Sequence, residues 1–199
     1  MLGYRVLNLS SGVEMRDAQL RTLARPFMVR IRKICRETTN LTVLVGRDIV
    51  YIEQLPGLRA LRMFAEPGRK IPAHATASGK AILASMRADD VDELLGEQPF
   101  ERFTPSTVVD LECLHAELET VRRNGFAVDR EEYEDAVTCI AAPILDAFHN
   151  PIAALSVSGP SSRLGMQQTV ADVGELIHDS AADAFRQLER RDHIGAISA

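Results

Sequence analysis

The chain has 199 residues, a formal net charge of −5, and a composition that is 46% hydrophobic and 26% charged. This length and balance predict one globular domain with a real core. An acidic chain without a lysine/arginine-rich block is a poor candidate for direct nucleic-acid binding. Cys35, Cys113 and Cys139 are widely spaced, so they support neither a disulfide framework nor a zinc site.

No apolar run approaches membrane-spanning length, and the chain shows no signal-peptide pattern. We therefore expect a soluble, cytoplasmic protein that makes no membrane contact. We also find no phosphate-cradling glycine loop and no metal-binding motif. The sequence thus predicts no cofactor and no metal.

The first part of the chain predicts helices that flank a run of hairpin strands. Apolar residues recur at helical spacing over residues 17–38, where Pro26 should kink or divide the helix. Gly46-Arg47-Asp48 is a hairpin signal between two apolar runs. The predicted elements are a helix at 17–38, strands at 41–45, 49–54 and 58–64, a helix that starts at Thr76 or Ser78 and ends at Met86, and helices at 89–95 and 110–124.

Residues 125–160 carry the most informative pattern, because side chains in a strand point alternately to opposite faces. In the last predicted strand Ser156 and Ser158 share one face. A simple hairpin register places Cys139 near Ser158 and Ala141 near Ser156. The predicted elements here are strands at 126–131, 138–145 and 152–158, a loop at 161–165 and a helix at 166–191.

This register creates one bulky apolar face and one face of small residues that carry hydroxyl and thiol groups. Small residues opposite each other leave costly voids in a close-packed core. Two interpretations follow: a large side chain from elsewhere fills the small face, or the small face is the floor of a binding cavity. The element order predicts an α+β fold, an antiparallel sheet of about six strands with helices on one face or both.

A catalytic interpretation is also open. Cys139, or Ser156 in its place, could act as a nucleophile with His74 as base and Asp129 as orienting group, as in a cysteine- or serine-dependent hydrolase. No nucleophile motif supports it, and a buried cysteine is more often a small core residue. His74 could equally hydrogen-bond a loop or helix cap, and Lys80 is either a counter-charge for an anion or a solvated helix lysine.

Three motifs together resemble a known family. IPAHATASGKAILA at residues 71–84, GFAVDREEYEDAVTCIAAPILD at 125–146 and PIAALSVSGPSSR at 151–163 look like the effector-binding domain of IclR-type bacterial transcription regulators. The resemblance covers roughly residues 13–188. The segment LGYRVLNL is similar to the end of the family's winged helix-turn-helix domain. The resemblance thus implies a linker remnant at 1–12 and an effector-binding domain at 13–199, with the DNA-binding domain absent.

The resemblance implies a GAF-like fold with a small-molecule pocket over one sheet face. The effector would bind against the small polar face and is expected to be a carboxylate. The domain would form a homodimer or a tetramer. Operator DNA would be contacted only through the missing N-terminal domain. A ligand-free oligomerisation module with a filled core is the remaining alternative. The pocket positions implied by the resemblance are Ala77, Ser78, Gly79, Asp129, Cys139, Ser156 and Ser158.

Overall fold

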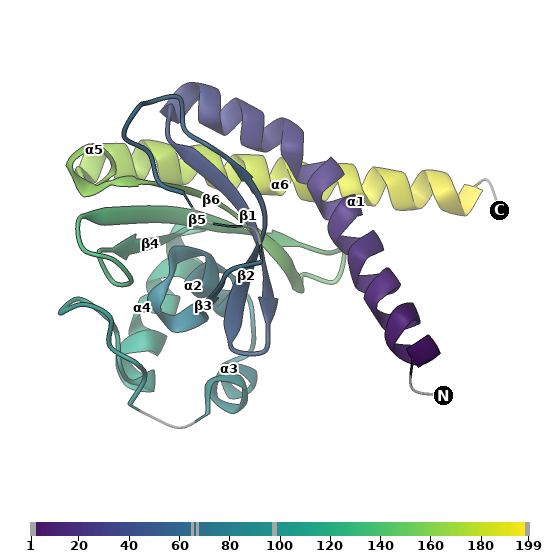
Figure 1. The fold of residues 1–199 in the computed structure, drawn as a ribbon, viewed down its shortest axis with the longest axis horizontal. Coiled ribbons are helices and arrows are strands. Elements are labelled where there is room, and N and C mark those ends of the chain that lie inside the picture. The colour runs from purple at the N-terminus through teal and green to yellow at the C-terminus, as the bar shows by residue number, and fades with distance from the viewer. Residues whose placement is uncertain (1–2, 65, 67, 97–98, 198–199) are drawn as a thin grey trace.

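The computed structural model describes residues 3–64, 66, 68–96 and 99–197, with side chains placed between residues 14 and 187. Its centre is a six-stranded antiparallel sheet with the strand order β3-β2-β1-β6-β5-β4 (Figure 1). This confirms the predicted α+β, GAF-like architecture. The strands are β1 (Thr38–Val45), β2 (Asp48–Leu55), β3 (Lys70–Pro72), β4 (Ala127–Arg130), β5 (Val137–Leu145) and β6 (Pro151–Pro160).

Helices cover both faces of this sheet. The long helices α1 and α6 lie on one face, and α2 and α4 lie on the other (Figure 1). Each face has its own apolar core, and a fully buried side chain such as Ile31 or Leu155 contributes roughly 1.5–3 kcal/mol. The helices are α1 (Gly3–Cys35), the 3-10 turn η1 (Ala73–Ala75), α2 (Ala77–Ala84), α3 (Ala88–Leu95), α4 (Leu111–Asn124), α5 (Ser161–Leu164) and α6 (Gln167–Ile197).

Helix α1 is longer than the predicted helix at 17–38. Pro26 lies inside it, and the helix bends without ending (Figure 1). A proline removes one backbone hydrogen bond and crowds the preceding turn, which accounts for a bend. Residues 1–2 of the predicted linker remnant lie outside the described residues, and residues 3–12 continue α1. The division at residue 12 therefore stays a prediction.

The hairpin registers agree with the sequence pattern. Residues 46 and 47 form the tight turn between β1 and β2, with Gly46 at a φ of 60°. Between β5 and β6, Cys139 pairs with Ser158 and Ala141 pairs with Ser156. The two faces of β6 are therefore the predicted ones, with its large apolar residues turned towards α1 and α6.

The predicted strand at residues 58–64 is wrong. This segment is irregular, because the edge of β2 next to it is occupied by β3, with Val50 opposite Lys70. Its apolar side chains have no sheet face to cover, and Phe64 is 65% exposed. Single hydrogen bonds hold the segment, such as the one from Thr38 Oγ1 to the Met63 carbonyl at 2.7 Å. The predicted loop at 161–165 also differs, since it forms the short helix α5.

Candidate functional site

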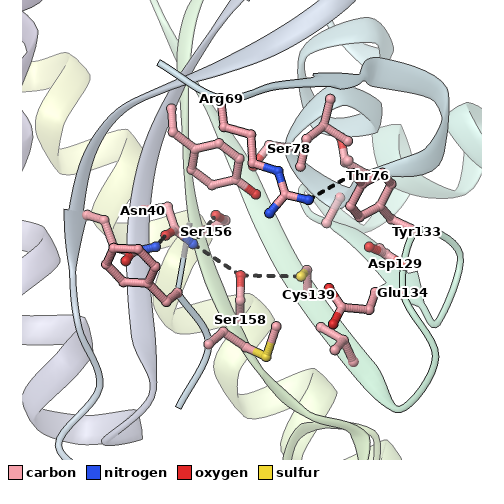
Figure 2. Close-up of a pocket in the computed structure, with 17 residues that line it drawn as sticks. Asn40, Arg69, Thr76, Ser78, Asp129, Tyr133, Glu134, Cys139, Ser156 and Ser158 are labelled. Carbon is pink, nitrogen blue, oxygen red and sulfur yellow. Dashed lines mark hydrogen bonds between the residues drawn. The ribbon is translucent and has the colours of Figure 1, made fainter. Parts of the chain in front are cut away.

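A cavity lies on the α2 side of the sheet, over β1, β6, β5 and β4 (Figure 2). The cavity volume is about 50 Å³, which is room for a few water-sized groups. The small polar face of the sheet therefore lies under a narrow cavity, in agreement with the second of the two interpretations.

The structure brings six of the seven predicted site residues to this cavity. Gly79 is the exception, because it lies further along α2 and does not line the space. The six that line it are Ala77, Ser78, Asp129, Cys139, Ser156 and Ser158.

A hydrogen-bond network holds the floor. Gln54 Nε2 donates to Asn40 Oδ1 at 2.9 Å, and Asn40 Nδ2 donates to Ser158 Oγ at 3.1 Å and to Ser156 Oγ at 3.3 Å. Cys139 Sγ also donates to Ser158 Oγ, at 3.3 Å (Figure 2). A serine hydroxyl has two lone pairs and one proton. Because Ser158 accepts two hydrogen bonds, its own proton is left to donate to a ligand.

The N-terminal end of α2 forms one wall of the cavity. Thr76 caps the helix, since its Oγ1 accepts the Gly79 N–H at 3.0 Å. A Cβ at Gly79 would lie 2.1 Å from the Ala73 carbonyl oxygen, so this glycine allows close packing. The N–H groups of Ala77 and Ser78 precede the first intrahelical bond and have no acceptor within the described residues. They are available to an anion, and the helix dipole favours one.

Asp129 contributes the buried carboxyl group of the cavity. It pairs with Cys139 in the sheet register, is 3% exposed, and accepts the Glu132 N–H through Oδ1 at 2.8 Å. Burial and the negative charge of Glu132 raise the pKa of Asp129 to about 7. The backbone N–H groups of Glu132 and Tyr133 and the charge of Lys80 act in the opposite direction. Near neutral pH, Asp129 therefore exists in both protonation states.

The rim of the cavity was missed by sequence reasoning. Arg69 Nη2 donates to Tyr133 Oη at 3.1 Å, and its guanidinium lies 5.7 Å from the centre of the Tyr133 ring (Figure 2). Met63 and Phe64 also line the cavity. These residues lie in irregular segments, where no periodicity reveals the direction of a side chain. The one local hint in the sequence was Tyr133, an aromatic residue within the acidic run at 131–135.

Lys80 is neither a solvated helix lysine nor a lining residue. It is 0% exposed, and its Nζ lies 2.5 Å from both Glu117 Oε2 and Glu132 Oε1. Burial lowers the pKa of Lys80, but the charges of Glu132 and Glu117 outweigh burial and hold it above its usual value. The lysine therefore ties α2 to α4 and to the loop that follows β4.

The proposed catalytic triad does not assemble. His74 is buried outside the cavity, with Nε2 3.0 Å from the Glu101 carbonyl oxygen and its ring 4.9 Å from that of Phe100. Burial and the charge of Asp129 raise the pKa of the Cys139 thiol far above its usual range. The thiol is thus inert, since the thiolate is the nucleophilic form. His74 instead holds a loop, as the alternative interpretation expected.

Two further properties of the described residues bear on function. No helix of the described ranges is both long enough and apolar enough to cross a membrane. Over the same part of the chain, histidine, cysteine and carboxylate side chains form no cluster of three that could hold a metal ion.

Comparison with known proteins identifies similar sequences. The family described as "Bacterial transcriptional regulator IclR C-terminal" matches residues 14–186. The HTH-type transcriptional repressor AllR of Escherichia coli K12 is 34% identical over 192 residues, which is 96% of this chain and 70% of that protein. AllR of Salmonella typhimurium is 35% identical over 182 residues, or 92% of this chain and 66% of that protein.

Solved structures share the fold. The Thermotoga maritima IclR structure matches with a TM-score of 0.82 and 31% identity, covering 94% of this chain and 74% of its own. An IclR homolog from Microbacterium hydrocarbonoxydans complexed with 4-hydroxybenzoate matches with a TM-score of 0.75 and 29% identity. The match covers 87% of this chain and 70% of that one. The inducer-binding domain of PobR from Acinetobacter, a double mutant in complex with 3-hydroxybenzoic acid, matches with a TM-score of 0.72 and 27% identity. The match covers 81% of this chain and 95% of that one.

Proposed function

Because the chain belongs to the IclR family of bacterial transcriptional regulators, as an effector-binding domain, we propose that its cavity binds a small carboxylate effector. One observation carries this proposal: the hydrogen-bond donors converge on the cavity. The donors are the backbone N–H groups of Ala77 and Ser78 and the hydroxyl groups of Ser156 and Ser158. A carboxylate offers only acceptors, so it complements such a set.

The relatives support the same ligand class. Two similar structures are described as complexes with 4-hydroxybenzoate and 3-hydroxybenzoic acid, which are aromatic acids. The similar curated proteins are transcriptional repressors and not enzymes, in agreement with the unreactive Cys139. Aromatic acids, small 2-oxo acids and sugar acids are therefore the classes to test.

Effector binding would act on DNA through a longer protein. The curated relatives are HTH-type repressors, and this chain aligns with 70% of the Escherichia coli one. We propose that a winged helix-turn-helix domain joined to the N-terminal end of α1 contacts the operator, and that bound effector changes its DNA affinity. The effector-binding domains would associate as a homodimer or a tetramer.

A thermal-shift screen with 4-hydroxybenzoate, pyruvate and gluconate tests the ligand class. A ligand at one hundred times its Kd stabilises a protein by about 2.7 kcal/mol. For a domain of this size the melting temperature should rise by about 5–11 °C. Failure of all three acids to raise it would contradict a carboxylate effector.

A matched pair of serine variants separates the cavity from general stability. Ser158→Ala removes a donor from the floor and should reduce the ligand-induced shift. Ser180→Ala removes another buried hydroxyl, on α6, which donates to the Leu176 carbonyl, and should leave the shift unchanged. Equal losses in the two variants would place the binding site elsewhere.

A further inference from the structure

Asp129 places a carboxyl group against the cavity in which the proposed effector carries its own carboxylate (Figure 2). The residue is 3% exposed, and Glu132 N–H holds its Oδ1. Two carboxylates that share a buried site do not both stay ionised unless a cation compensates them. The charge state of Asp129 therefore depends on the cations around it.

The buried cation Lys80 is already neutralised by its own partners. The single ammonium of Lys80 contacts the carboxylates of both Glu117 and Glu132 at 2.5 Å. This cluster of three residues carries a net charge of −1 when all its members are ionised. An ionised Asp129, whose Oδ1 accepts the Glu132 backbone N–H, would add a second uncompensated negative charge to the same region.

The other groups around Asp129 supply little compensation. Tyr51 and Cys139 stay neutral because burial raises the pKa of each far above its usual value. Arg69 keeps its charge, because its partner Tyr133 is neutral, but it lies exposed at the rim and forms no ion pair with Asp129. The titratable and charged groups that face Asp129 are Tyr51 of β2, Arg69 before β3, Lys80 of α2, Cys139 of β5, and Glu132, Tyr133 and Glu134 after β4.

Resting on the carboxylate function proposed above, we propose that this domain binds its effector together with a proton, which is held on Asp129. The protonated carboxyl donates a hydrogen bond where the ionised form would repel the ligand. All the floor groups that meet the effector are then donors. Burial and the charge of Glu132, which raise the pKa of Asp129 to about 7 before any ligand is present, support this assignment. A bound anion would raise that pKa further.

Proton uptake makes the affinity depend on pH in a defined direction. Below pH 7 most of the free protein already carries the proton, so affinity is nearly constant. Above pH 7 binding must take up a proton, and affinity falls by about tenfold per pH unit. Between pH 6 and pH 8 the Kd should therefore increase by about tenfold.

Isothermal titration with pyruvate, 4-hydroxybenzoate and gluconate from pH 6 to pH 8.5 tests the proposal. Each titration is repeated in buffers of different ionisation enthalpy, so that the number of protons taken up is measured directly. We expect uptake that approaches one proton per ligand at pH 8. A carbon-13 titration of the Asp129 carboxyl, with and without ligand, assigns the proton to its residue.

Two variants separate Asp129 from other carboxyl groups. Asp129→Asn keeps an oxygen for the Glu132 N–H and keeps a permanent donor for the ligand, so its Kd should be independent of pH and lower than the wild-type Kd at pH 8. Asp135→Asn changes an exposed carboxyl of the same loop that does not line the cavity, and it should retain the wild-type pH dependence.

The outcomes distinguish this inference from the function beneath it. Ligand binding that is independent of pH, or binding lost at every pH in a stable Asp129→Asn variant, overturns the proton proposal and leaves the sensor role intact. The second result would make Asp129 an ionised acceptor for an effector hydroxyl. No binding of the three acids by either protein at any pH overturns both proposals.

Discussion

Asn40 Nδ2 lies 3.1 Å from Ser158 Oγ, although the two residues are 118 positions apart in the chain. Asn40 sits on β1 between Gln54 of β2 and the serines of β6, and it hydrogen-bonds to both sides. One side chain thus links three neighbouring strands at the floor of the cavity. The amide also fixes the orientation of the Ser156 and Ser158 hydroxyl groups.

Replacing Asn40 by alanine should lower the free energy of unfolding by about 1–3 kcal/mol, because buried serine oxygens lose their donor. Urea denaturation measures the loss. Asn150→Ala is the control, since its amide bonds Asp146 in an exposed turn and should cost less than about 0.5 kcal/mol. Similar losses in both variants would show that the floor network adds nothing.

Replacing Lys80 by methionine should lower the free energy of unfolding by about 3–5 kcal/mol, since two carboxylates lose their buried cation. Guanidinium denaturation at pH 7 checks this value. The double variant Lys80→Met with Glu132→Gln should be more stable than the single variant, because it also removes the buried charge of Glu132. A loss below about 1 kcal/mol would indicate a solvated pair.

Stability should fall as the pH rises from 4 to 7, because Asp129 binds a proton more tightly in the folded chain than in the unfolded chain. Its pKa is about 7 when folded and 3.8 for the reference group, so the contribution is complete below pH 4 and is lost as pH passes 7. The difference is roughly 4 kcal/mol. Wild-type and Asp129→Asn denaturation curves should diverge by this amount. Parallel curves would contradict the raised pKa.

Gly79→Ala should destabilise the domain by at least about 2 kcal/mol, because the new Cβ would overlap the Ala73 backbone. At Gly46 a Cβ meets no atom within 4 Å, and only the positive φ resists an alanine, at a cost of about 1–2 kcal/mol. Thermal denaturation compares the two. A larger loss at Gly46 would show that α2 can move away from η1.

The part of the floor on β5 and β6 was readable from the sequence because its signal is local, whereas Asn40 and Gln54, which complete the floor network, were not predicted. Strand alternation and one turn place Cys139 opposite Ser158 and Ala141 opposite Ser156, and the structure has this register. Gly79 was assigned to the site only by the family resemblance. Its N–H is occupied by the Thr76 cap, which is a local contact that the resemblance does not specify.

The rest of the site depends on contacts that no local pattern encodes. Lys80 finds its partners Glu117 and Glu132 37 and 52 residues away, and nothing in the helix sequence distinguishes it from a solvated lysine. The segment at 58–64 contains strand-forming residues, yet β3 occupies the sheet edge it would need. In the second case tertiary competition for the sheet edge overrode strand propensity.

The irregular segment at 58–64 has a consequence for how this scaffold can diversify. Met63 and Phe64 reach the cavity from backbone that belongs to no strand ladder, whereas Asn40 and Ser158 reach it from the two central strands. Loops accept substitution and length change more readily than the elements they connect. If the cavity binds the proposed effector, exchanging this segment for that of another family member should therefore change which ligand is selected and leave the hydrogen-bonding groups of the central strands in place.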